Sequence, residues 1–380
     1  MGLEGIRETI DQIDDQLIEL FAKRMNAVRG VAQYKRQNHL PILDSGRERE
    51  IVNRLSEKAG PELERYVKAL YRTLFDLSRG YQAGVLGAGS PLSVAIADAL
   101  MSRRSEMPNR ALVACQGTEG AYSQKACDRM FAFASILYMN SFDDVFAAVE
   151  KGMCPYGVLP IENSSAGSVT QVYDLMERHR FHIVRAVRER IEHKLLAIPG
   201  ARLEDIREVV SHEQALRQCS AFFHEHPKIK QTEFANTAKA AEFVAQSGRK
   251  DLAVIASGDC RDLYELTILS DSVSNSENNF TRFICIAKDM EIYDGANKIS
   301  LMLSTAHSPG ALGRVIAQIS AAGVNLTKLE SRPIPGSDFN FRFFFDMEAS
   351  LANPEARALL CELERLSDQF TLLGNYEEMR

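Results

Sequence analysis

The sequence predicts a multidomain fold with an all-α N-terminal segment, an α/β middle segment and an α+β C-terminal tail. Three observations predict it. Residues 3–35 lack proline and carry apolar side chains at a three-four spacing, which is typical of one long helix. Residues 111–287 alternate short apolar runs with helical patterns, as α/β proteins with largely parallel sheets do. Residues 298–380 follow the order strand, helix, strand, strand, helix, strand.

The composition is that of a globular protein. Of the 380 residues, 45% are hydrophobic and 25% are charged, so the chain has enough apolar side chains for several cores. A net charge of -6 argues against a nucleic-acid partner. The N-terminus is charged at once and no apolar run approaches the ~18–20 residues that span a bilayer, so we expect a cytoplasmic protein without a membrane partner. Seven dispersed cysteines predict reduced thiols, with neither a disulfide framework nor a metal site.

The first segment, residues 1–82, is predicted to be all-α. Gly60-Pro61 separates two shorter helical stretches, at about 44–59 and 62–82, that follow the long helix. A helix of ~33 residues runs ~50 Å and cannot bury its apolar stripe against itself. We therefore expect a partner for the stripe, most simply a second copy of the chain in a homodimer or a higher homo-oligomer.

Two cations interrupt the apolar stripe of the long helix. Arg24 and Lys35 occupy positions where the pattern predicts apolar side chains, and their Cα atoms would lie ~16 Å apart on one face. A small anion fits between two such side chains, although both could instead snorkel to solvent at a helical interface. Arg7 lies ~25 Å along the helix from Arg24 and could serve only a partner's pocket. Further polar positions open the second helix or share one face of the third: Asp44, Arg47, Glu48, Ser78 and Gln82.

These eight polar positions resemble the site of the all-helical class of chorismate mutases. The resemblance implies an intertwined dimer in which the long helix donates its first arginine across the interface. The implied substrate-binding residues are Arg7, Arg24, Asp44, Arg47 and Ser78, and the implied catalytic residues are Lys35, Glu48 and Gln82. The reaction converts chorismate to prephenate by rearranging a dianion, without a nucleophile, an acid, a base or a cofactor. Arginines would clamp the carboxylates, while Lys35 and Gln82 would donate hydrogen bonds to the ether oxygen.

Residues 83–110 are predicted to form a linker with one short helix, and residues 111–290 an α/β domain. The strands expected in this domain span residues 111–116, 156–162, 208–211, 252–257 and 280–287. The helices expected between them span residues 121–132, 141–151, 167–180, 213–225 and 236–247.

Four polar segments mark the α/β domain. Gly117–Ser123, Pro160–Ser168 and Ser211–Cys219 each lie where a predicted strand gives way to a helix, and Asn279–Phe283 enters a strand. Hydroxyls, amides and backbone N–H groups at helix starts bind carboxylates, although each segment alone is also ordinary N-capping. The glycine-rich loop lacks the spacing of nucleotide-binding loops, so no nucleotide cofactor is expected.

Together, in this order, the four segments resemble prephenate dehydratase. The resemblance implies two α/β lobes, similar in architecture to periplasmic binding proteins, with the site in the cleft between the lobes. The implied catalytic residues are Glu162, Asn163, His212, Gln218 and Thr281, and the implied substrate-binding residues are Ser164, Ser165 and Ser211.

The reaction that this resemblance implies removes carbon dioxide and the ring hydroxyl of prephenate, and it leaves phenylpyruvate. Thr281 would donate a hydrogen bond to the leaving hydroxyl, with His212 or Glu162 as the source of the proton. Arg282 follows Thr281 on a strand and therefore points to the opposite face, where we expect an ion pair.

The tail, residues 298–380, is predicted to be a ferredoxin-like module. Pro309–Leu312 and Glu330–Pro333 resemble the phenylalanine-binding signatures of the ACT regulatory domains attached to prephenate dehydratases. The resemblance implies that tails pair side by side and bind phenylalanine as an effector. The implied effector-binding residues are Gly310, Ala311, Leu312, Glu330, Ser331, Arg332 and Pro333.

The three resemblances predict a bifunctional enzyme that acts on chorismate and prephenate and is inhibited by phenylalanine. Three alternatives stay open. The first is a non-catalytic two-lobed binding protein, against which the charged N-terminus and the Thr281 motif argue. The second is a regulatory helical dimer with a vestigial mutase site, against which the intact set of cations argues. The third is an enzyme that prefers arogenate, which carries an amino group where prephenate carries a keto group.

Overall fold

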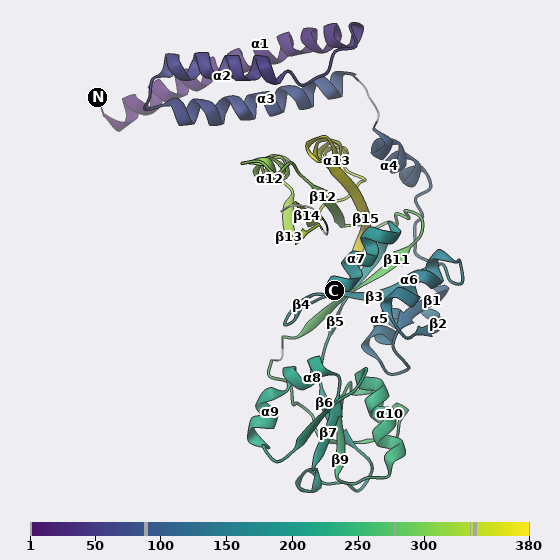
Figure 1. Cartoon of the computed structure of the whole chain (residues 1–380). Helices are drawn as coiled ribbons and strands as arrows, with labels where there is room; N and C mark the ends of the chain where they lie inside the picture. The colour runs from purple at the N-terminus through teal and green to yellow at the C-terminus, as the bar shows by residue number, and fades with distance from the viewer. Residues whose placement is uncertain (1, 87–89, 277, 335, 337–339, 380) are drawn as a thin grey trace. The chain divides into compact units, whose positions relative to one another are not determined.

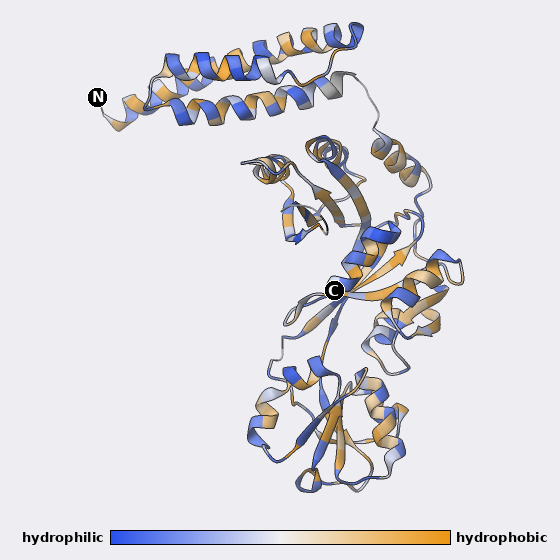
Figure 2. Ribbon diagram, viewed as in Figure 1, coloured by the Kyte–Doolittle hydropathy of each residue, from blue (hydrophilic) through white to orange (hydrophobic). Residues whose placement is uncertain are grey.

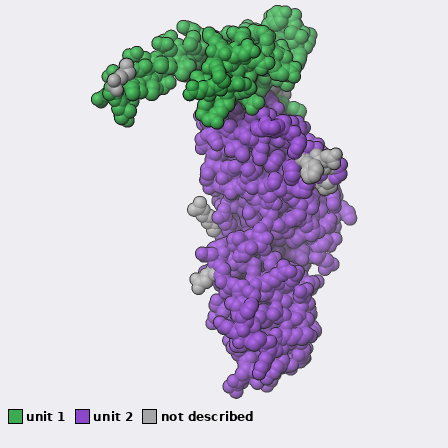
Figure 3. All heavy atoms as spheres, turned by 60° about the vertical axis from the view of Figure 1, so that its left-hand side comes forward, with its two compact units in different colours: residues 1–94 green, residues 95–380 purple. Residues whose placement is uncertain are grey.

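The computed structural model describes residues 2–86, 90–276, 278–334, 336 and 340–379. The chain divides into two compact units, Met1–Val94 and Ala95–Arg380, which Figure 3 distinguishes by colour. Among the described residues, no helix combines the length and the apolarity that crossing a membrane requires.

The first unit consists of three helices: α1 (Leu3–Gln37), α2 (Ser45–Ala59) and α3 (Glu64–Leu86) (Figure 1). The prediction of three helices is confirmed, with ends that differ by a few residues. Helix α3 packs against both α1 and α2. Asp44 caps α2, because its carboxylate accepts a hydrogen bond from the backbone N–H of Arg47 at 3.0 Å. Gly60, at φ +80°, ends α2 in a conformation that glycine adopts readily.

The apolar stripe of α1 is not covered within one chain. Its side chains at positions 6, 10, 13, 17, 20 and 31 are 44–60% exposed. Figure 2 shows the corresponding apolar positions along the helix. Among the described residues of this unit, Ala32 and Phe75 are the buried apolar side chains. A surface of this size requires another partner to bury it.

Helix α4 (Pro91–Met101) confirms the short helix that was predicted within residues 83–110. The strands of the second unit begin at residue 110. Within its described residues, ten strands form one sheet in the order β13-β14-β12-β15-β5-β11-β3-β1-β2, with β4 beside β3. The strands of the dehydratase-like part are β1 (Arg110–Gln116), β2 (Phe133–Met139), β3 (Tyr156–Asn163), β4 (Gly167–Ser168), β5 (His182–Arg190) and β11 (Phe280–Ala287). Helices α5 (Tyr122–Met130), α6 (Phe142–Glu150) and α7 (Thr170–His179) pack against these strands.

A second sheet, in the order β10-β6-β9-β7-β8, forms another lobe. Its strands are β6 (Lys194–Ala197), β7 (Glu208–Ser211), β8 (Lys230–Glu233), β9 (Leu252–Ala256) and β10 (Thr267–Ser270). Its helices are α8 (Glu213–Gln218), α9 (Ser220–Glu225), α10 (Thr237–Ser247) and α11 (Asp259–Leu263), with a 3-10 turn at Leu203–Asp205. The chain crosses between the lobes twice, after β5 and before β11, as the two-lobed prediction requires (Figure 1).

Two predictions about these lobes are wrong in detail. The sheets are mixed, because β11 runs antiparallel to both β3 and β5, and β6 runs antiparallel to β9 and β10. The helix predicted over residues 213–225 is two helices, α8 and α9, which Cys219 separates at φ −115° and ψ 21°.

The tail has the predicted βαββαβ order, with β12 (Lys298–Ser304), α12 (Ala311–Ala321), β13 (Asn325–Pro333), β14 (Phe341–Glu348), α13 (Pro354–Leu366) and β15 (Gln369–Met379). It was predicted as a separate domain, but β15 pairs in parallel with β5 and joins the tail to the first lobe. Gly374 permits this approach, because a Cβ atom there would lie 2.1 Å from the carbonyl oxygen of Ile183. The regulatory-like tail and the catalytic-like lobe therefore share one sheet.

Candidate active sites

The first cluster of predicted site residues lies between α1 and α3. The guanidinium group of Arg24 donates hydrogen bonds to the hydroxyl of Ser78 and to the carbonyl oxygen of Leu74, the latter at 3.4 Å. Ser78 and Gln82 are both buried, one helical turn apart on α3. The side-chain oxygen of Gln82 is buried and has no hydrogen-bond partner among the described residues. The Arg24 guanidinium group can bind an anionic ligand beside Ser78, whereas the unpartnered oxygen of Gln82 requires a hydrogen-bond donor.

The remaining residues of this cluster are only partly brought together. Lys35 donates to the carbonyl oxygen of Ile42 at 2.5 Å, and the exposed Arg47 pairs with Glu50 at 2.7 Å. Glu48 forms an ion pair with Arg79, a residue of α3 that the sequence patterns did not single out. Arg7 is exposed near the start of α1, away from the cluster along the helix, as the helical distance predicts.

The second cluster is a network of side-chain amides between the two lobes. Asn163 ends β3 and lies opposite Thr281 in the register of β3 and β11. The side-chain oxygen of Asn163 accepts hydrogen bonds from the backbone N–H groups of Ser165 at 3.0 Å and Ala166 at 2.9 Å. Because backbone N–H groups only donate, they fix which end of the Asn163 amide faces them.

The amide nitrogen of Asn163 therefore donates to the hydroxyl oxygen of Thr281, at 2.9 Å, and to the side-chain oxygen of Asn279, at 2.8 Å. The Thr281 hydroxyl thus acts as an acceptor here. Within the described part of the chain it donates to no other group. Its hydrogen is consequently available to a ligand, which agrees with the role expected for Thr281.

Gln218, at the end of α8, joins this network to the second lobe. Its side-chain nitrogen faces the Asn163 oxygen at 3.4 Å, and its side-chain oxygen accepts from the nitrogen of Asn279 at 3.0 Å. The same oxygen lies 2.9 Å from Nε2 of His193. Neither His193 nor Asn279 was among the predicted site residues. Asn279 lay within a recognised polar segment, whereas the pattern around His193 gave no signal.

A cleft of about 540 Å³ borders the network, and its lining includes Ser165, His212, Arg217, Gln218 and Asn279. Nδ1 of His212 accepts a hydrogen bond from the backbone N–H of Gln214 at 3.2 Å, so Nε2 carries the proton of the neutral ring. A guanidinium group, an imidazole N–H and amides suit a ligand with carboxylate and hydroxyl groups.

Two of the predicted serines hold the fold together. Ser211 is fully buried and its hydroxyl donates to the carbonyl oxygen of Ile255 at 2.5 Å, so the prediction that Ser211 binds substrate is wrong. The hydroxyl of Ser164 donates to the carbonyl oxygen of Asn278 and accepts from the N–H of Phe280, which ties β3 to the start of β11.

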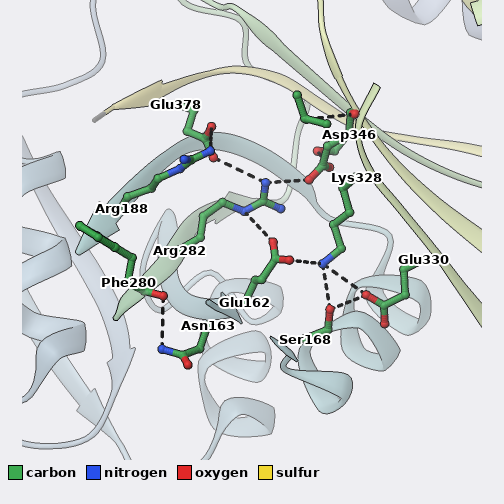
Figure 4. A network of polar contacts seen from close by, with 12 residues as sticks. Glu162, Asn163, Ser168, Arg188, Phe280, Arg282, Lys328, Glu330, Asp346 and Glu378 are labelled. Atoms are coloured by element: carbon green, nitrogen blue, oxygen red, sulfur yellow. Dashed lines mark hydrogen bonds and ion pairs between the residues drawn. The ribbon is translucent and has the colours of Figure 1, made fainter. Parts of the chain in front are cut away.

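The structure also contradicts Glu162 as a proton source for the Thr281 site. Successive side chains of a strand point to opposite faces, so Glu162 points away from the face that Asn163 uses. Figure 4 shows its carboxylate beside Lys328 of the tail, at 3.1 Å, and near Arg282, at 3.9 Å. The ion pair expected for Arg282 is confirmed, because its guanidinium group lies 2.6 Å from the carboxylate of Asp346.

The polar segments do not all border the same cavity. Tyr122, from the segment Gly117–Ser123, lines a second cavity of about 640 Å³ together with Arg188, Lys194 and Ser257. Burial raises the pKa of the Tyr122 phenol, whose hydroxyl donates to the carbonyl oxygen of Glu192 at 2.6 Å. The expectation of one shared site therefore holds for three of the four segments.

The two effector-like segments of the tail lie apart in one chain. Gly310, at φ +83°, precedes α12, and Ala311 and Leu312 line a cavity of about 350 Å³ with Phe341 and Phe343.

Strand β13 presents alternate side chains to different surroundings. The carboxylate of Glu330 contacts the hydroxyl of Ser168, and Arg332 lies 2.9 Å from the carboxylate of Asp174. Ser331 and Pro333 are exposed. Glu330 and Arg332 are therefore not free to line an effector pocket, contrary to the prediction.

The helical unit with its Arg24–Ser78 contact, and the two-lobed unit with its amide-lined cleft, are those of a multidomain enzyme with two separate polar sites. Residues 6–83 match the family model of type II chorismate mutases, and residues 113–291 match that of prephenate dehydratases. The chain belongs to the family of bifunctional chorismate mutase/prephenate dehydratases. The protein of that name from Escherichia coli is 32% identical, over 98% of this chain and 96% of its own length.

Two further relatives resemble the second unit. The arogenate dehydratase/prephenate dehydratase 1 of Arabidopsis thaliana is 36% identical over 70% of this chain and 71% of its own length. The crystal structure of prephenate dehydratase from Arthrobacter aurescens in complex with L-Phe superposes with a TM-score of 0.64. It is 25% identical, over 70% of this chain and 90% of that chain.

Proposed function

We propose that the chain converts chorismate to prephenate in its helical unit, and prephenate to phenylpyruvate, carbon dioxide and water in the cleft between its lobes, under feedback inhibition by phenylalanine. The observation that carries the second activity is the hydroxyl of Thr281, which accepts from the Asn163 amide and has no acceptor for its own hydrogen among the described residues. The similarity to the bifunctional Escherichia coli protein along 98% of the chain supports both activities together.

In the helical unit, Arg24 would clamp a carboxylate of chorismate while Gln82 donates a hydrogen bond to the ether oxygen that gains negative charge. The Arg24–Ser78 contact and the burial of Gln82 one turn further along α3 support this assignment, with the side-chain nitrogen of Gln82 as the donor. The exposed stripe of α1 supports a homodimer in which Arg7 of one chain completes the site of the other. Lys35 lies on the same face of α1 and would join Gln82 at the ether oxygen.

In the cleft, Arg217 and Ser165 would hold the carboxylate groups of prephenate, and Thr281 would donate a hydrogen bond to the ring hydroxyl. The bond between the ring and its carboxylate breaks, and its electron pair enters the ring as carbon dioxide leaves. The hydroxyl departs with a proton as water, and the ring becomes aromatic. His212 lines the same cleft, and its Nε2–H would donate a hydrogen bond to the departing hydroxyl, while solvent water supplies the proton that completes the product water.

Feedback inhibition would begin in the tail, with phenylalanine bound near Gly310 and Leu312 at an interface between two tails. The contacts of Glu330 with Ser168 and of Arg332 with Asp174 support a route from the tail to the dehydratase part. Lys328 adds to this route, because it contacts both Glu330, at 3.3 Å, and Glu162. An effector that favours one position of β13 would thereby act on the strand that carries Asn163.

Product analysis tests the proposed function. Purified protein is incubated separately with chorismate, prephenate and arogenate, and products are separated by chromatography. We expect prephenate and phenylpyruvate from chorismate, phenylpyruvate from prephenate, and inhibition of the second step by added phenylalanine. Faster turnover of arogenate than of prephenate would reassign the cleft to arogenate, and binding of prephenate without turnover would reassign it to a binding protein.

A further inference from the structure

His193 lies in the first of the two segments that cross between the lobes, after β5 and before β6. The residue is 3% exposed, and its Nε2 atom lies 2.9 Å from the side-chain oxygen of Gln218. No step of the proposed mechanism uses His193. Because His193 lies at the end of the amide network, the ring nitrogen that carries its hydrogen affects the hydrogen bonds as far as Thr281.

The direction of every hydrogen bond in the network follows from the backbone. The N–H groups of Ser165 and Ala166 require an oxygen from Asn163, so Gln218 must turn its nitrogen toward that oxygen. The oxygen of Gln218 then faces His193, whose Nε2 atom must carry a hydrogen.

The other tautomer of His193 would present a lone pair to Gln218. That lone pair would favour a flipped Gln218 amide, with its nitrogen toward His193 and its oxygen toward the oxygen of Asn163. That arrangement conflicts with the amide of Asn279 as well, because its nitrogen needs the Gln218 oxygen as acceptor. The Nε2–H tautomer of His193 is therefore compatible with a network in which every donor faces an acceptor. The other tautomer leaves donors and acceptors of the network mismatched.

We propose that His193 is a positioning residue: by donating from Nε2 to Gln218, it fixes the amide network that leaves the Thr281 hydroxyl hydrogen free for the substrate. This proposal rests on the proposed dehydratase function. His193 itself reaches the reacting atoms only through Gln218 and Asn163.

The surroundings of His193 favour the neutral, Nε2-protonated ring. Burial lowers the pKa of His193, against a smaller opposing effect of its hydrogen bond to Gln218. The groups that face it are Gln218, the hydroxyl of Ser274, which accepts from the His193 backbone N–H at 3.3 Å, and the ring of Tyr122, edge-on at 6.2 Å. Among the described residues, Nδ1 is buried without a partner, so a second proton there would find no acceptor.

Steady-state kinetics on prephenate tests the proposal with four variants of the full chain: His193→Leu, His193→Gln, Gln218→Leu and the double variant His193→Leu/Gln218→Leu. Loss of the donor leaves a buried acceptor without a partner, so we expect His193→Leu to lower kcat about 10- to 100-fold with little change in KM. His193→Gln places an amide N–H near the position of Nε2 and should restore most of the rate. The double variant should be no slower than Gln218→Leu alone, because His193 acts through Gln218.

His182→Leu is the matched control. His182 is a second histidine of this unit whose pKa burial lowers and whose Nδ1 atom has no partner among the described residues, but it contacts the backbone of Leu372, outside the amide network. Its replacement should leave kcat on prephenate unchanged. Thermal melting followed by circular dichroism shows whether each variant is folded.

Side-chain nitrogen NMR of the wild-type protein gives a measurement that needs no folded variant. We expect the ring resonances of His193, assigned through their correlations with the His193 backbone, to be those of an Nε2–H tautomer. An Nδ1–H tautomer, a full rate in folded His193→Leu, or multiplicative losses in the double variant would each overturn the proposal. Absence of turnover by the wild-type enzyme would instead refute the proposed dehydratase function.

Discussion

Replacing Arg282 by methionine should destabilise the second unit strongly near neutral pH. The Arg282 side chain is 9% exposed and contacts the carboxylates of Asp346, at 2.6 Å, and Glu378, at 3.5 Å, whose side chains are 7% and 8% exposed (Figure 4). Breaking a buried ion pair by removing one partner leaves uncompensated charge and costs about 3–5 kcal/mol. For a unit of this size that corresponds to a fall of about 6–10 °C in the melting temperature.

The pH dependence of this effect has a definite sign. Burial alone would raise the pKa of Asp346, but the charge of Arg282 and the hydroxyl of Ser300 hold it below its ordinary value. Burial would likewise raise the pKa of Glu378, which Lys298 and Arg282 hold down. In the wild type this stabilisation is present above the ordinary carboxylate pKa and is lost as the pH falls through the lowered values. Removing Arg282 removes the largest effect that holds the pKa of Asp346 down, so this pKa rises and acidification should relieve part of the penalty.

Melting curves at neutral pH and at about pH 5 check this prediction. Arg188→Met is the matched control, because Arg188 also contacts Glu378, at 2.9 Å, but its side chain is 50% exposed. Its loss should cost less than about 1 kcal/mol. The reasoning is refuted if Arg282→Met and Arg188→Met have the same melting temperature at neutral pH. It is also refuted if the difference in melting temperature between Arg282→Met and the wild type does not become smaller at the lower pH.

Further predictions concern activity. Arg24→Ala should lower the rate of chorismate rearrangement about 100-fold or more, since a carboxylate clamp is lost, while dehydration of added prephenate stays unchanged. Thr281→Ala should lower the rate of prephenate dehydration and leave chorismate rearrangement unchanged. Separate assays of the two steps check both predictions. Mixed Arg7→Ala and Arg24→Ala chains should regain mutase activity after subunit exchange, and no recovery would contradict a shared site. Gly310→Val should raise the phenylalanine concentration for half-inhibition without changing the uninhibited rate, because its backbone has φ +83° and a branched side chain blocks close approach to it; unchanged inhibition curves would contradict an effector site there.

The sequence predicts a separate tail, so its removal would be the obvious test of regulation. In the structure, however, removal of the whole tail is a poor test. Strand β15 pairs with β5, and Arg282 of the dehydratase part depends on Asp346 and Glu378 of the tail. A chain that ends before residue 298 would expose the edge of β5 and deprive Arg282 of the two tail carboxylates that it contacts. Loss of activity in such a chain would report on stability rather than on feedback. Point changes near Gly310 avoid this problem.

The sequence predicted many, but not all, of the elements whose patterns are local. The apolar spacing of residues 3–35 and the βαββαβ order of the tail depend on neighbours along the chain, and both were found. Five longer strands of the α/β domain were missed: β2, β5, β6, β8 and β10. Of these, β8 (Lys230–Glu233) shows no apolar alternation and is held by parallel pairing with β7. The antiparallel position of β11 between β3 and β5 and the joining of the tail to β5 are long-range pairings, which no local pattern reports.

The site was predictable where polar residues of separate segments join one hydrogen-bonded network. Asn163, Gln218 and Thr281 were named together and lie together. Glu162 was assigned to the same site as Asn163, although two adjacent residues of a strand point to opposite faces and cannot both face one site. His193 and Arg79 act through partners that are distant in sequence, Gln218 and Glu48, so only the folded chain identifies them.

Alternation on β13 gives the effector-like motif two roles. Glu330 and Arg332 face the dehydratase part, while Ser331 between them is exposed. Lys328, one alternation earlier on the same face, contacts Glu330 and Glu162 together, and Glu162 is bonded in the chain to Asn163. A displacement of β13 therefore changes the charges around the strand that orders the Thr281 hydroxyl, without any ligand entering the cleft. A motif that looks like a single binding signature in sequence thus divides, residue by residue, between contacts with the dehydratase part and an exposed surface.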